Sequence, residues 1–331
     1  MNRVGIVGSG SWGTALSVLI AQTAPEVLLW GREPDLIHAI DSAHENPRYL
    51  PGIPLPEKVR ATTDFAALAQ VDALFVVVPS KAIRQVAGQI AGLGLPSHVP
   101  VVSCAKGIEN ATGLRMSQIL AEILPAHPVA VLSGPNHAEE VARRLPAAAV
   151  VGCVDPTVSR HLQDLIVCPW FRAYPSEDVC GMEWGGAAKN IFAIAAGIAE
   201  GLKLGDNAKA ALLTRGLAEM IRLGLAMGGR PETFQGLSGV GDLIVTCFSH
   251  HSRNHRVGQA LGRGEKLAEI VERLGMVAEG VPNTESIHHA SQRAGVRTPI
   301  IDTMYAVLYE GLPCHEALRS LLERDPRPEV E

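Results

Sequence analysis

Short apolar runs alternate with helix-compatible stretches through the first half of the chain. The runs cover residues 4–7, 27–30, 73–78, 99–103, 129–132 and 147–151. Several of them are apolar throughout, which is typical of strands that helices cover on both faces. Strands and helices that alternate in this way predict a doubly wound parallel sheet of the Rossmann type, in the α/β class. The interval 45–57 carries four prolines and is expected to be a loop.

Beyond about Tyr174 the pattern changes to helices, which are expected at residues 179–202, 208–227, 252–263, 267–274, 284–294, 299–309 and 315–322. Glycine and proline mark the breaks between them. A length of 331 residues also suits two domains, at about 150 residues each. We therefore predict a dinucleotide-binding Rossmann domain at 1–178 and an all-helical substrate and catalytic domain at 179–331.

Composition narrows the class of protein. With 47% hydrophobic and 19% charged residues, the chain has ordinary globular usage, which excludes a disordered protein. A net charge of −5 provides no broad basic face, so we expect no nucleic-acid partner. The longest apolar run, near residues 191–199, is far shorter than the roughly 18–20 residues that span a bilayer. We therefore do not expect an integral membrane protein.

The start of the chain and its cysteines predict a cytoplasmic location. The sequence opens directly into the run at 4–7, without the charged lead and cleavage site of a signal peptide. Its six cysteines include no CxxC pair, which favours free thiols in a reducing compartment over a disulfide frame or a zinc site. Histidines gather at 250, 251 and 255, but no HExxH motif supports a metal, and we expect none.

A G-x-G-x-x-G motif, with Gly8, Gly10 and Gly13 as its glycines, follows the first predicted strand and precedes a helix-compatible stretch. The first two glycines let the turn close and the backbone approach a pyrophosphate, and the third lets helix and strand pack closely. Free N–H groups at the start of the helix then hold the phosphates. The motif predicts a bound dinucleotide; the alternative is a glycine turn in an unrelated sheet.

The end of the second predicted strand bears on the choice of dinucleotide. NAD-specific sites usually place an acidic residue there to hold the ribose 2′-hydroxyl. This chain has Arg32 followed by Glu33. Because an arginine can pair with a 2′-phosphate, the sequence favours NADPH, while Glu33 leaves the use of NADH open. The alternative is that Arg32 is a solvated surface residue.

Candidate substrate residues follow two further strands. Lys106 comes after the run at 99–103, and Gly134 and Asn136 come after the run at 129–132. Ligands of open parallel sheets bind outside the carboxyl ends of the strands, so these residues are expected to border one crevice. Otherwise Lys106 is an ordinary surface lysine.

Lys189 and Asn190 lie inside the apolar segment 185–199. Burial disfavours the charged form of a lysine and lowers its pKa, which suits proton transfer near neutral pH. The alternative is a lysine at a helix edge that extends its ammonium group to solvent. The spacing leaves both interpretations open.

A second glycine-rich loop, at 236–241, leads into Asp242. If the following stretch is helical, Asp242 and Thr246 lie on one face of it. Asp242 could then hold a substrate hydroxyl or orient Lys189. It could also be a helix-capping aspartate, which the spacing slightly favours.

The segment Ser252-Arg253-Asn254 is expected to begin a helix, with Ser252 as its N-cap. An arginine in the first turn of a helix, beside free backbone N–H groups, suits a small phosphate. We therefore predict a phosphate site there.

With these motifs in this order, the chain resembles the NAD(P)-dependent sn-glycerol-3-phosphate dehydrogenase family over nearly its whole length. The blocks that carry the resemblance are GSGSWGTAL, LWGRE, CAKGIE, LSGPNHA, GGAAKNIFAIAAGI, GDNAKAALLTRGLAEM, GLSGVGDLIVTC and SRNHRVG. The resemblance implies a reversible reaction in which dihydroxyacetone phosphate and NAD(P)H give sn-glycerol 3-phosphate for glycerophospholipid synthesis. It also implies a homodimer in the cytoplasm.

The resemblance implies that Lys189 is the general acid/base. The residues that match the family's substrate contacts are Lys106, Asp242, Ser252, Arg253 and Asn254, with Gly134 and Asn136 in the substrate loop; Asn190 and Thr246 join them for their places beside Lys189 and Asp242. Those that match its cofactor contacts are Ser11, Trp12, Arg32, Tyr49, Lys106, Ala138, Arg253, Val277 and Glu279. The chain departs from the family at Asn136, where serine is common, and at His137, where an aromatic residue is common.

Two other functions are compatible with a Rossmann domain followed by helices. A β-hydroxyacid dehydrogenase of similar architecture also uses a lysine on a helix, but it has no need to read a phosphate through Arg253. A dinucleotide-binding regulator without catalysis has no need of a proton donor such as Lys189. Loss of NAD(P)H absorbance on addition of dihydroxyacetone phosphate separates the three.

Overall fold

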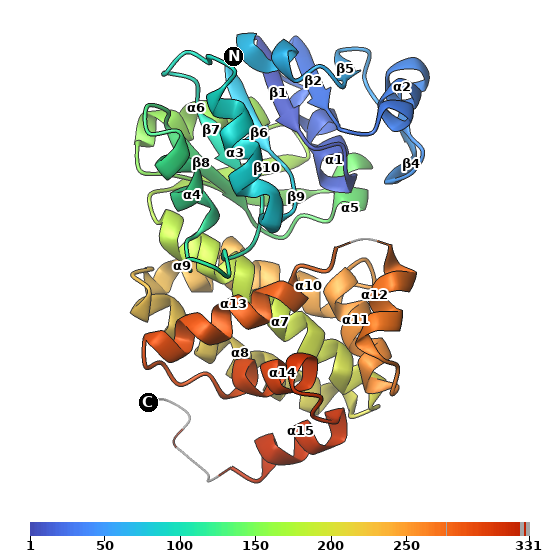
Figure 1. Cartoon of the computed structure of the whole chain (residues 1–331), viewed down its shortest axis with the longest axis vertical. Helices are drawn as coiled ribbons and strands as arrows, with labels where there is room; N and C mark the ends of the chain where they lie inside the picture. The colour runs from blue at the N-terminus through green and yellow to red at the C-terminus, as the bar shows by residue number, and fades with distance from the viewer. Residues whose placement is uncertain (276, 325–327, 329–331) are drawn as a thin grey trace.

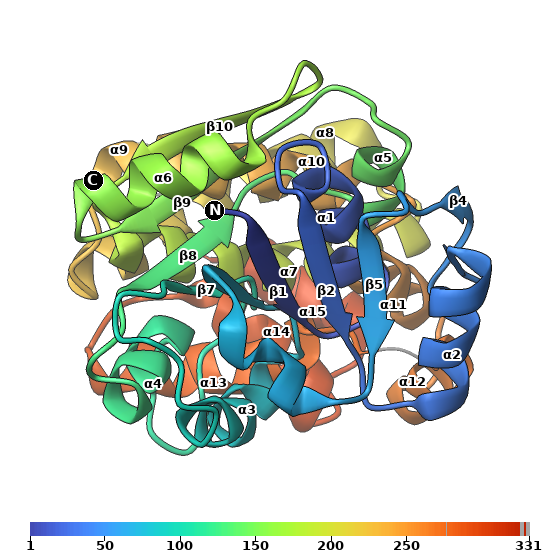
Figure 2. The same ribbon diagram turned by 90° about the horizontal axis from the view of Figure 1, so that it is seen from above.

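An eight-stranded sheet forms the centre of the N-terminal part of the protein (Figures 1 and 2). The computed structural model describes residues 1–275, 277–324 and 328. The strands of the sheet are β1 (Arg3–Val7), β2 (Glu26–Trp30), β5 (Val59–Thr62), β6 (Ala73–Val76), β7 (Val101–Ser103), β8 (Val129–Ser133), β9 (Ala147–Cys153) and β10 (Phe171–Ser176). Their spatial order is β10-β9-β8-β7-β6-β1-β2-β5, and every neighbouring pair is parallel except β8 and β9.

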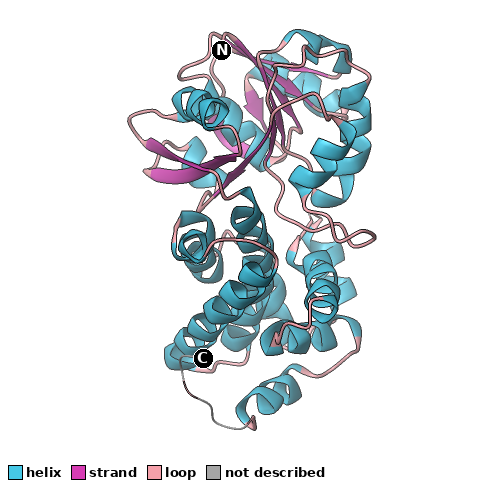
Figure 3. Cartoon of the chain, turned by 90° about the vertical axis from the view of Figure 1, so that its left-hand side faces the viewer, coloured by secondary structure: helices cyan, strands magenta, loops and turns pink. Residues whose placement is uncertain are grey.

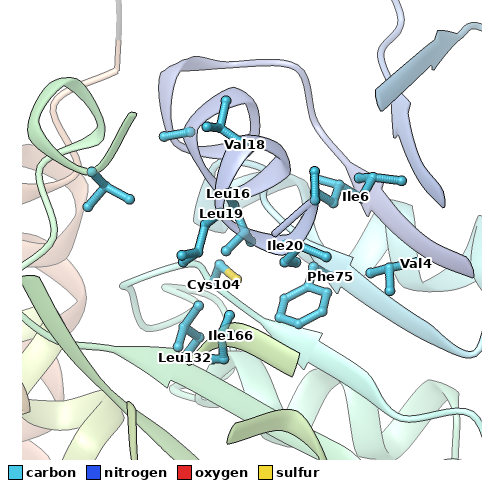
Figure 4. Close-up of a cluster of buried hydrophobic side chains, with 14 of the residues drawn as sticks. Val4, Ile6, Leu16, Val18, Leu19, Ile20, Phe75, Cys104, Leu132 and Ile166 are labelled. Carbon is cyan, nitrogen blue, oxygen red and sulfur yellow. The ribbon is translucent and has the colours of Figure 1, made fainter. Parts of the chain in front are cut away.

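Helices cover both faces of this sheet, as Figure 2 shows. They are α1 (Ser11–Ile20), α2 (Pro34–Ala43), α3 (Ile83–Ala91), α4 (Met116–Ile123), α5 (Ala138–Ala142) and α6 (Pro156–Ile166). Helices α1, α5 and α6 share one buried cluster with one face of the strands, and α3 and α4 share another with the opposite face. In Figure 4, Leu16 and Leu19 of α1 lie in the first cluster with Phe75 of β6 and Leu132 of β8. The predicted doubly wound arrangement is confirmed.

The C-terminal part contains helices joined by loops, and no strand among its described residues (Figure 3). Its elements are α7 (Val179–Gly201), α8 (Gly205–Ala226), α9 (Pro231–Gln235), the π-helical turn η3 (Leu237–Gly241), α10 (Asp242–Phe248), α11 (Arg253–Gly262), α12 (Leu267–Leu274), α13 (Gly280–Arg293), α14 (Pro299–Tyr309) and α15 (Cys314–Leu322). The predicted helices are all present, and none of the described helices is long and apolar enough to cross a membrane.

Helix α7 is buried along almost its whole length and packs against α8, α10, α11 and α13. Its contact with α11 is close because glycines face backbone across it. A Cβ at Gly197 would lie 2.1 Å from the carbonyl oxygen of His255, and one at Gly258 would lie 1.9 Å from that of Ile194. Only glycine lets the two backbones approach so closely, and this contact fixes α11 relative to α7.

Strands β9 and β10 depart from the predicted all-parallel sheet, because β9 runs antiparallel to β8. The connection between β8 and β9 contains only α5, a helix of five residues. A parallel return usually needs a helix long enough to carry the chain back across the sheet, and α5 is too short for that. The chain therefore re-enters the sheet from the end at which β8 stopped.

The interval 45–57 is not the loop that its prolines predict. It contains β3 (Glu45–Asn46) and β4 (Leu50–Pro54), which pair as a separate antiparallel two-stranded sheet. Proline is tolerated where a strand lies at a sheet edge, because the missing N–H then has no partner to lose. Strands β5 and β10 were also not predicted from the sequence. They are the edge strands of the main sheet, and their exposed residues interrupt the apolar pattern.

Candidate functional site

The turn between β1 and α1 has the geometry that a dinucleotide pyrophosphate needs. Gly8 has a φ of +120°, and a Cβ there would lie 2.2 Å from the carbonyl oxygen of Val77. A Cβ at Gly13 would lie 1.8 Å from the carbonyl oxygen of Gly8. Gly10 is the N-cap of α1 without a side-chain cap bond, and a Cβ on it would meet no heavy atom of the described structure within 4 Å. The first N–H groups of α1 are therefore open to an anion.

A buried asparagine ties the β3–β4 hairpin to this turn. Asn46 is fully buried, and its Nδ2 donates to the carbonyl oxygen of Ser9 at 2.9 Å and to Oγ1 of Thr14 at 2.8 Å. Its Oδ1 accepts from the N–H of Tyr49 at 3.0 Å, while the Ser11 hydroxyl donates to the carbonyl oxygen of Tyr49 at 2.8 Å. Two predicted cofactor residues, Ser11 and Tyr49, are thus brought together. Sequence reasoning missed Asn46, because a lone asparagine among prolines carries no motif.

At the end of β2, Arg32 is exposed and lines an open groove with Glu33 and Arg48. The Glu33 carboxylate does not stand free in this groove. Its Oε2 accepts from Nη1 of Arg48 at 2.5 Å, and its Oε1 accepts from the Tyr49 hydroxyl at 3.3 Å. Arg48 is a second residue that sequence reasoning missed, since it lies in the interval expected to be a loop.

Two lysines share one carboxylate at the junction of the sheet and the helices. Lys189 of α7 donates from Nζ to Oδ1 of Asp242 at 2.8 Å and to the Thr246 hydroxyl at 2.6 Å. Lys106, which follows β7, donates to the other carboxylate oxygen, Oδ2, and to the carbonyl oxygen of Gly134 at 3.0 Å. The structure thus brings five predicted substrate or catalytic residues, from the loops after β7 and β8 and from α7 and α10, into one cluster.

Burial controls the charges in this cluster. Lys189 is 7% exposed, and burial lowers its pKa to about 8 although the Asp242 carboxylate opposes the change. Burial alone would raise the pKa of Asp242, but the ammonium groups of Lys106 and Lys189 outweigh it and hold that pKa below its usual value. Asp242 is therefore an anion near neutral pH, whereas Lys189 can change protonation state close to it. Lys189 does not extend to solvent.

The helix-cap interpretation of Asp242 is wrong. The N-cap of α10 is Gly241, and no side chain caps this helix. Thr246 lies one turn further along α10, on the same face as Asp242, and its hydroxyl donates to the carbonyl oxygen of Asp242 at 2.6 Å. Asp242 and Thr246 therefore share one face of α10, as predicted. Both accept hydrogen bonds from Lys189 there, and Asp242 also accepts one from Lys106.

Helix α11 begins as the sequence predicts. Ser252 is its N-cap, and the serine hydroxyl accepts from the N–H of His255 at 3.2 Å. Arg253, the first helical residue, is exposed. Asn254 is buried; its Nδ2 donates to Oδ1 of Asn190 at 2.8 Å, and its Oδ1 accepts from the N–H of Gly280 at 2.9 Å. The two asparagines therefore connect α7, α11 and α13.

The loop after β8 turns toward the helical part. Gly134 has a φ of +143°. The Asn136 amide donates to the carbonyl oxygen of Ala148 on β9 at 2.9 Å, so it holds the loop against the sheet. Ala138 opens α5 and is buried against the cluster that includes α1. His137 lies with Nε2 3.5 Å from the carbonyl oxygen of Val245, and burial lowers its pKa, with a contribution from the Lys189 charge.

Glu279 joins the two parts of the protein. Its carboxylate accepts from the N–H of Ser80 at 2.9 Å and from the Ser80 hydroxyl at 2.6 Å, in the segment that follows β6. Val277, half-buried, precedes it by two residues. Sequence reasoning missed Ser80, because the contact spans 199 residues and leaves no local pattern.

Comparison with known proteins agrees with this geometry. The sequence profile for the N-terminus of NAD-dependent glycerol-3-phosphate dehydrogenase matches residues 3–159, and the profile for its C-terminus matches residues 178–319. The glycerol-3-phosphate dehydrogenase [NAD(P)+] of an Exiguobacterium species is 48% identical over 335 residues, covering 100% of this chain and 98% of that protein. The enzyme of the same name from Bacillus pumilus is 49% identical, covering 100% and 97%. The crystal structure of glycerol-3-phosphate dehydrogenase from Coxiella burnetii superimposes with a TM-score of 0.93 at 38% identity, over 98% of this chain and 99% of that one.

Proposed function

Because the chain belongs to the NAD-dependent glycerol-3-phosphate dehydrogenase family and has glycerol-3-phosphate dehydrogenase [NAD(P)+] activity, we propose that Lys189 is its general acid and base. The reaction interconverts dihydroxyacetone phosphate and sn-glycerol 3-phosphate, and its product supplies glycerophospholipid synthesis. The observation that carries the assignment is the shared carboxylate of Asp242, which holds Lys189 and Lys106 on its two oxygens.

In the reduction, protonated Lys189 donates its proton to the oxygen of the substrate carbonyl. In the reverse direction, neutral Lys189 accepts the proton of the secondary hydroxyl. A pKa of about 8 makes both forms accessible near neutral pH, which is the condition for efficient acid–base catalysis. Asp242 orients the ammonium group, and Lys106 places a second positive charge beside the same carboxylate. The cofactor, when bound, supplies or accepts the hydride.

The residues of the first half fit a dinucleotide. The open N–H groups of α1, after Gly8 and Gly10, suit the pyrophosphate, and the groove beside Arg32 suits the adenosine ribose. The exposed guanidinium of Arg32 favours NADPH over NADH. The remaining cofactor contacts proposed from family resemblance are Ser11, Trp12, Tyr49, Lys106, Ala138, Arg253, Val277 and Glu279.

The start of α11 suits the phosphate of the substrate. Arg253 is exposed at the first helical position, beside free backbone N–H groups, and α11 is packed tightly against the helix that carries Lys189. The proposed substrate contacts are Lys106, Gly134, Asn136, Lys189, Asn190, Asp242, Thr246, Ser252, Arg253 and Asn254.

The remaining proposals concern organisation and location. Residues 1–178 form the dinucleotide-binding domain and 179–331 the substrate domain, of which 276, 325–327 and 329–331 lie outside the described residues. The protein is a homodimer in the cytoplasm. All six cysteines are free thiols, which supports a reducing compartment. Light scattering on the purified protein checks the dimer by its mass.

Replacement of Lys189 by alanine tests the catalytic assignment. General acid–base groups contribute about 10²–10⁴-fold, so kcat for dihydroxyacetone phosphate should fall by that factor while the Kd for NADPH stays unchanged. Absorbance of NADPH reports turnover, and quenching of tryptophan fluorescence reports binding. Lys266→Ala, at an exposed lysine before α12, is the matched control. A Lys189→Ala enzyme that keeps more than about a tenth of wild-type kcat contradicts the assignment.

A further inference from the structure

The acidic residue at the end of β2 is already engaged by the protein. Glu33 is the residue that could hold a ribose 2′-hydroxyl in an NAD-specific site and repel a 2′-phosphate. Both of its carboxylate oxygens accept hydrogen bonds, one from Arg48 at 2.5 Å and one from Tyr49 at 3.3 Å. The neighbouring Arg32, in contrast, is exposed and forms no ion pair with another described residue. The groove therefore presents the Arg32 guanidinium, which has no ion-pair partner among the described residues, beside a Glu33 carboxylate whose charge is offset by Arg48.

The position of Arg48 is set by the glycine-rich turn itself. Asn46, two residues earlier, is buried and bonded to the backbone of Ser9, and Tyr49, one residue later, is bonded to Asn46 and Ser11. The guanidinium carbon of Arg48 lies 5.3 Å from the ring centroid of Tyr49. The segment that presents Arg48 to Glu33 is thus anchored on the turn that is proposed to bind the pyrophosphate.

We propose that Arg48 is a specificity-determining residue, which makes the site accept the 2′-phosphate of NADPH by engaging the Glu33 carboxylate. This inference rests on the proposed function, which places the adenosine ribose at the end of β2. Without Arg48, Glu33 would face a 2′-phosphate as an uncompensated negative charge, and it could bond the 2′-hydroxyl of NADH instead. Arg48 acts through Glu33 as a positioning residue, whereas Arg32 reads the phosphate.

Arg48 can be replaced with little effect on the stability of the fold. The side chains of Arg48 and Glu33 are 60% and 36% exposed, and exposed ion pairs contribute little to folding stability. Arg48→Ala should therefore leave the melting temperature almost unchanged. A change in cofactor selectivity can then be attributed to the groove rather than to the fold.

The experiment is a double-mutant cycle read by binding. Dissociation constants for NADPH, NADH, adenosine 2′,5′-bisphosphate and 5′-AMP are measured by calorimetry on the wild type, Arg48→Ala, Glu33→Gln and the double variant. Arg48→Ala should weaken NADPH and the bisphosphate by about tenfold or more, while NADH and 5′-AMP bind as before or tighter. In the double variant the charge that Arg48 masked is gone, so most of the lost NADPH affinity should return.

Three outcomes overturn the inference. If the double variant binds NADPH as weakly as Arg48→Ala, Arg48 does not act through Glu33. If Arg48→Ala weakens NADPH and NADH equally, its role is structural. If Arg48→Ala changes no affinity, it has no role in selectivity. Arg172→Ala, at an exposed arginine on the opposite edge strand β10, is the matched control.

Failure of the proposed cofactor site gives a different result. In that case Arg32→Ala leaves the wild-type preference for the bisphosphate over 5′-AMP unchanged. Loss of that preference in Arg32→Ala without any effect of Arg48→Ala rejects only the role of Arg48.

Discussion

Replacing Asp242 with asparagine tests the electrostatic design of the reaction centre. Lys189 donates to one carboxylate oxygen at 2.8 Å, and Lys106 donates to the other. Asparagine keeps the shape and one acceptor but removes the negative charge. Burial is the main cause of the lowered pKa of Lys189, and the Asp242 charge is the strongest group that opposes it. Asp242→Asn should therefore lower the pKa of Lys189 further, below about 8.

The size of the change follows from the energy of a buried ion pair. Removal of one partner of such a pair costs about 3–5 kcal/mol, and one pKa unit corresponds to about 1.36 kcal/mol. Asp242 serves two lysines, so we assign about half of this energy to Lys189, which lowers its pKa by about 1–2 units. Lys189 would then be mostly neutral at about pH 7.5, and the proton donor for the reduction would be scarce.

The pH dependence of kcat/KM in the two directions measures this shift. Reduction needs protonated Lys189, so the wild-type value for dihydroxyacetone phosphate is full at low pH and falls as pH rises through about 8. Oxidation needs neutral Lys189, so the value for sn-glycerol 3-phosphate rises through the same pH. Asp242→Asn should move both inflections about 1–2 units lower. Initial rates from NADPH absorbance between about pH 6 and pH 10 provide both profiles.

A matched control separates this effect from general damage. Asp164 is exposed on α6, and Asp164→Asn should leave both inflections in place. A thermal melt shows whether Asp242→Asn remains folded. If the folded variant keeps the wild-type inflections in both directions, the charge of Lys189 does not depend on Asp242, and the reasoning is refuted.

Two further changes probe the substrate phosphate and the packing that positions it. Arg253→Ala should lower kcat/KM for dihydroxyacetone phosphate by about tenfold to a hundredfold and leave the poor rate with dihydroxyacetone nearly unchanged; equal losses would place the phosphate elsewhere. Gly258→Ala should reduce the free energy of unfolding by about 1–3 kcal/mol or more in calorimetry, because its Cβ would lie 1.9 Å from the carbonyl oxygen of Ile194. An unchanged melting temperature would show that α7 and α11 can separate at no cost.

The parts of this fold that the sequence predicts are those with a local physical cause. The run at residues 4–7 is apolar because helices cover β1 on both faces, and the turn after it needs Gly8 and Gly13 because backbone atoms occupy the place of a side chain. Helix α14 (Pro299–Tyr309) has the predicted bounds, with proline at its first position, where its missing N–H has no partner to lose. Signals of this kind can be read from neighbouring residues.

The direction of β9 and the hairpin around Asn46 have no local cause that neighbouring residues in the sequence reveal. The reversal of β9 depends on the length of α5, which the apolar pattern does not define. Asn46 matters because it reaches Ser9, 37 residues away, and Arg48 matters because it reaches Glu33, 15 residues away. Only the folded chain brings these partners together, so residue type and spacing could not distinguish them from solvated residues of a loop.

Tertiary contacts also determine the roles of Lys189 and Asp242, for which the sequence spacing left two interpretations open. Lys189 could have extended to solvent, and Asp242 could have capped its helix, yet the chain folds so that these two residues, 53 positions apart, become partners. Glycine also allows close packing of the two helices at which anions are proposed to bind. Gly13 sets α1 against β1 where the dinucleotide phosphates are proposed to bind, and Gly258 sets α11 against α7 where the substrate phosphate is proposed to bind. The helix that begins each proposed anion site is thus held by close backbone contact, α1 against the end of β1 and α11 against the helix that carries Lys189.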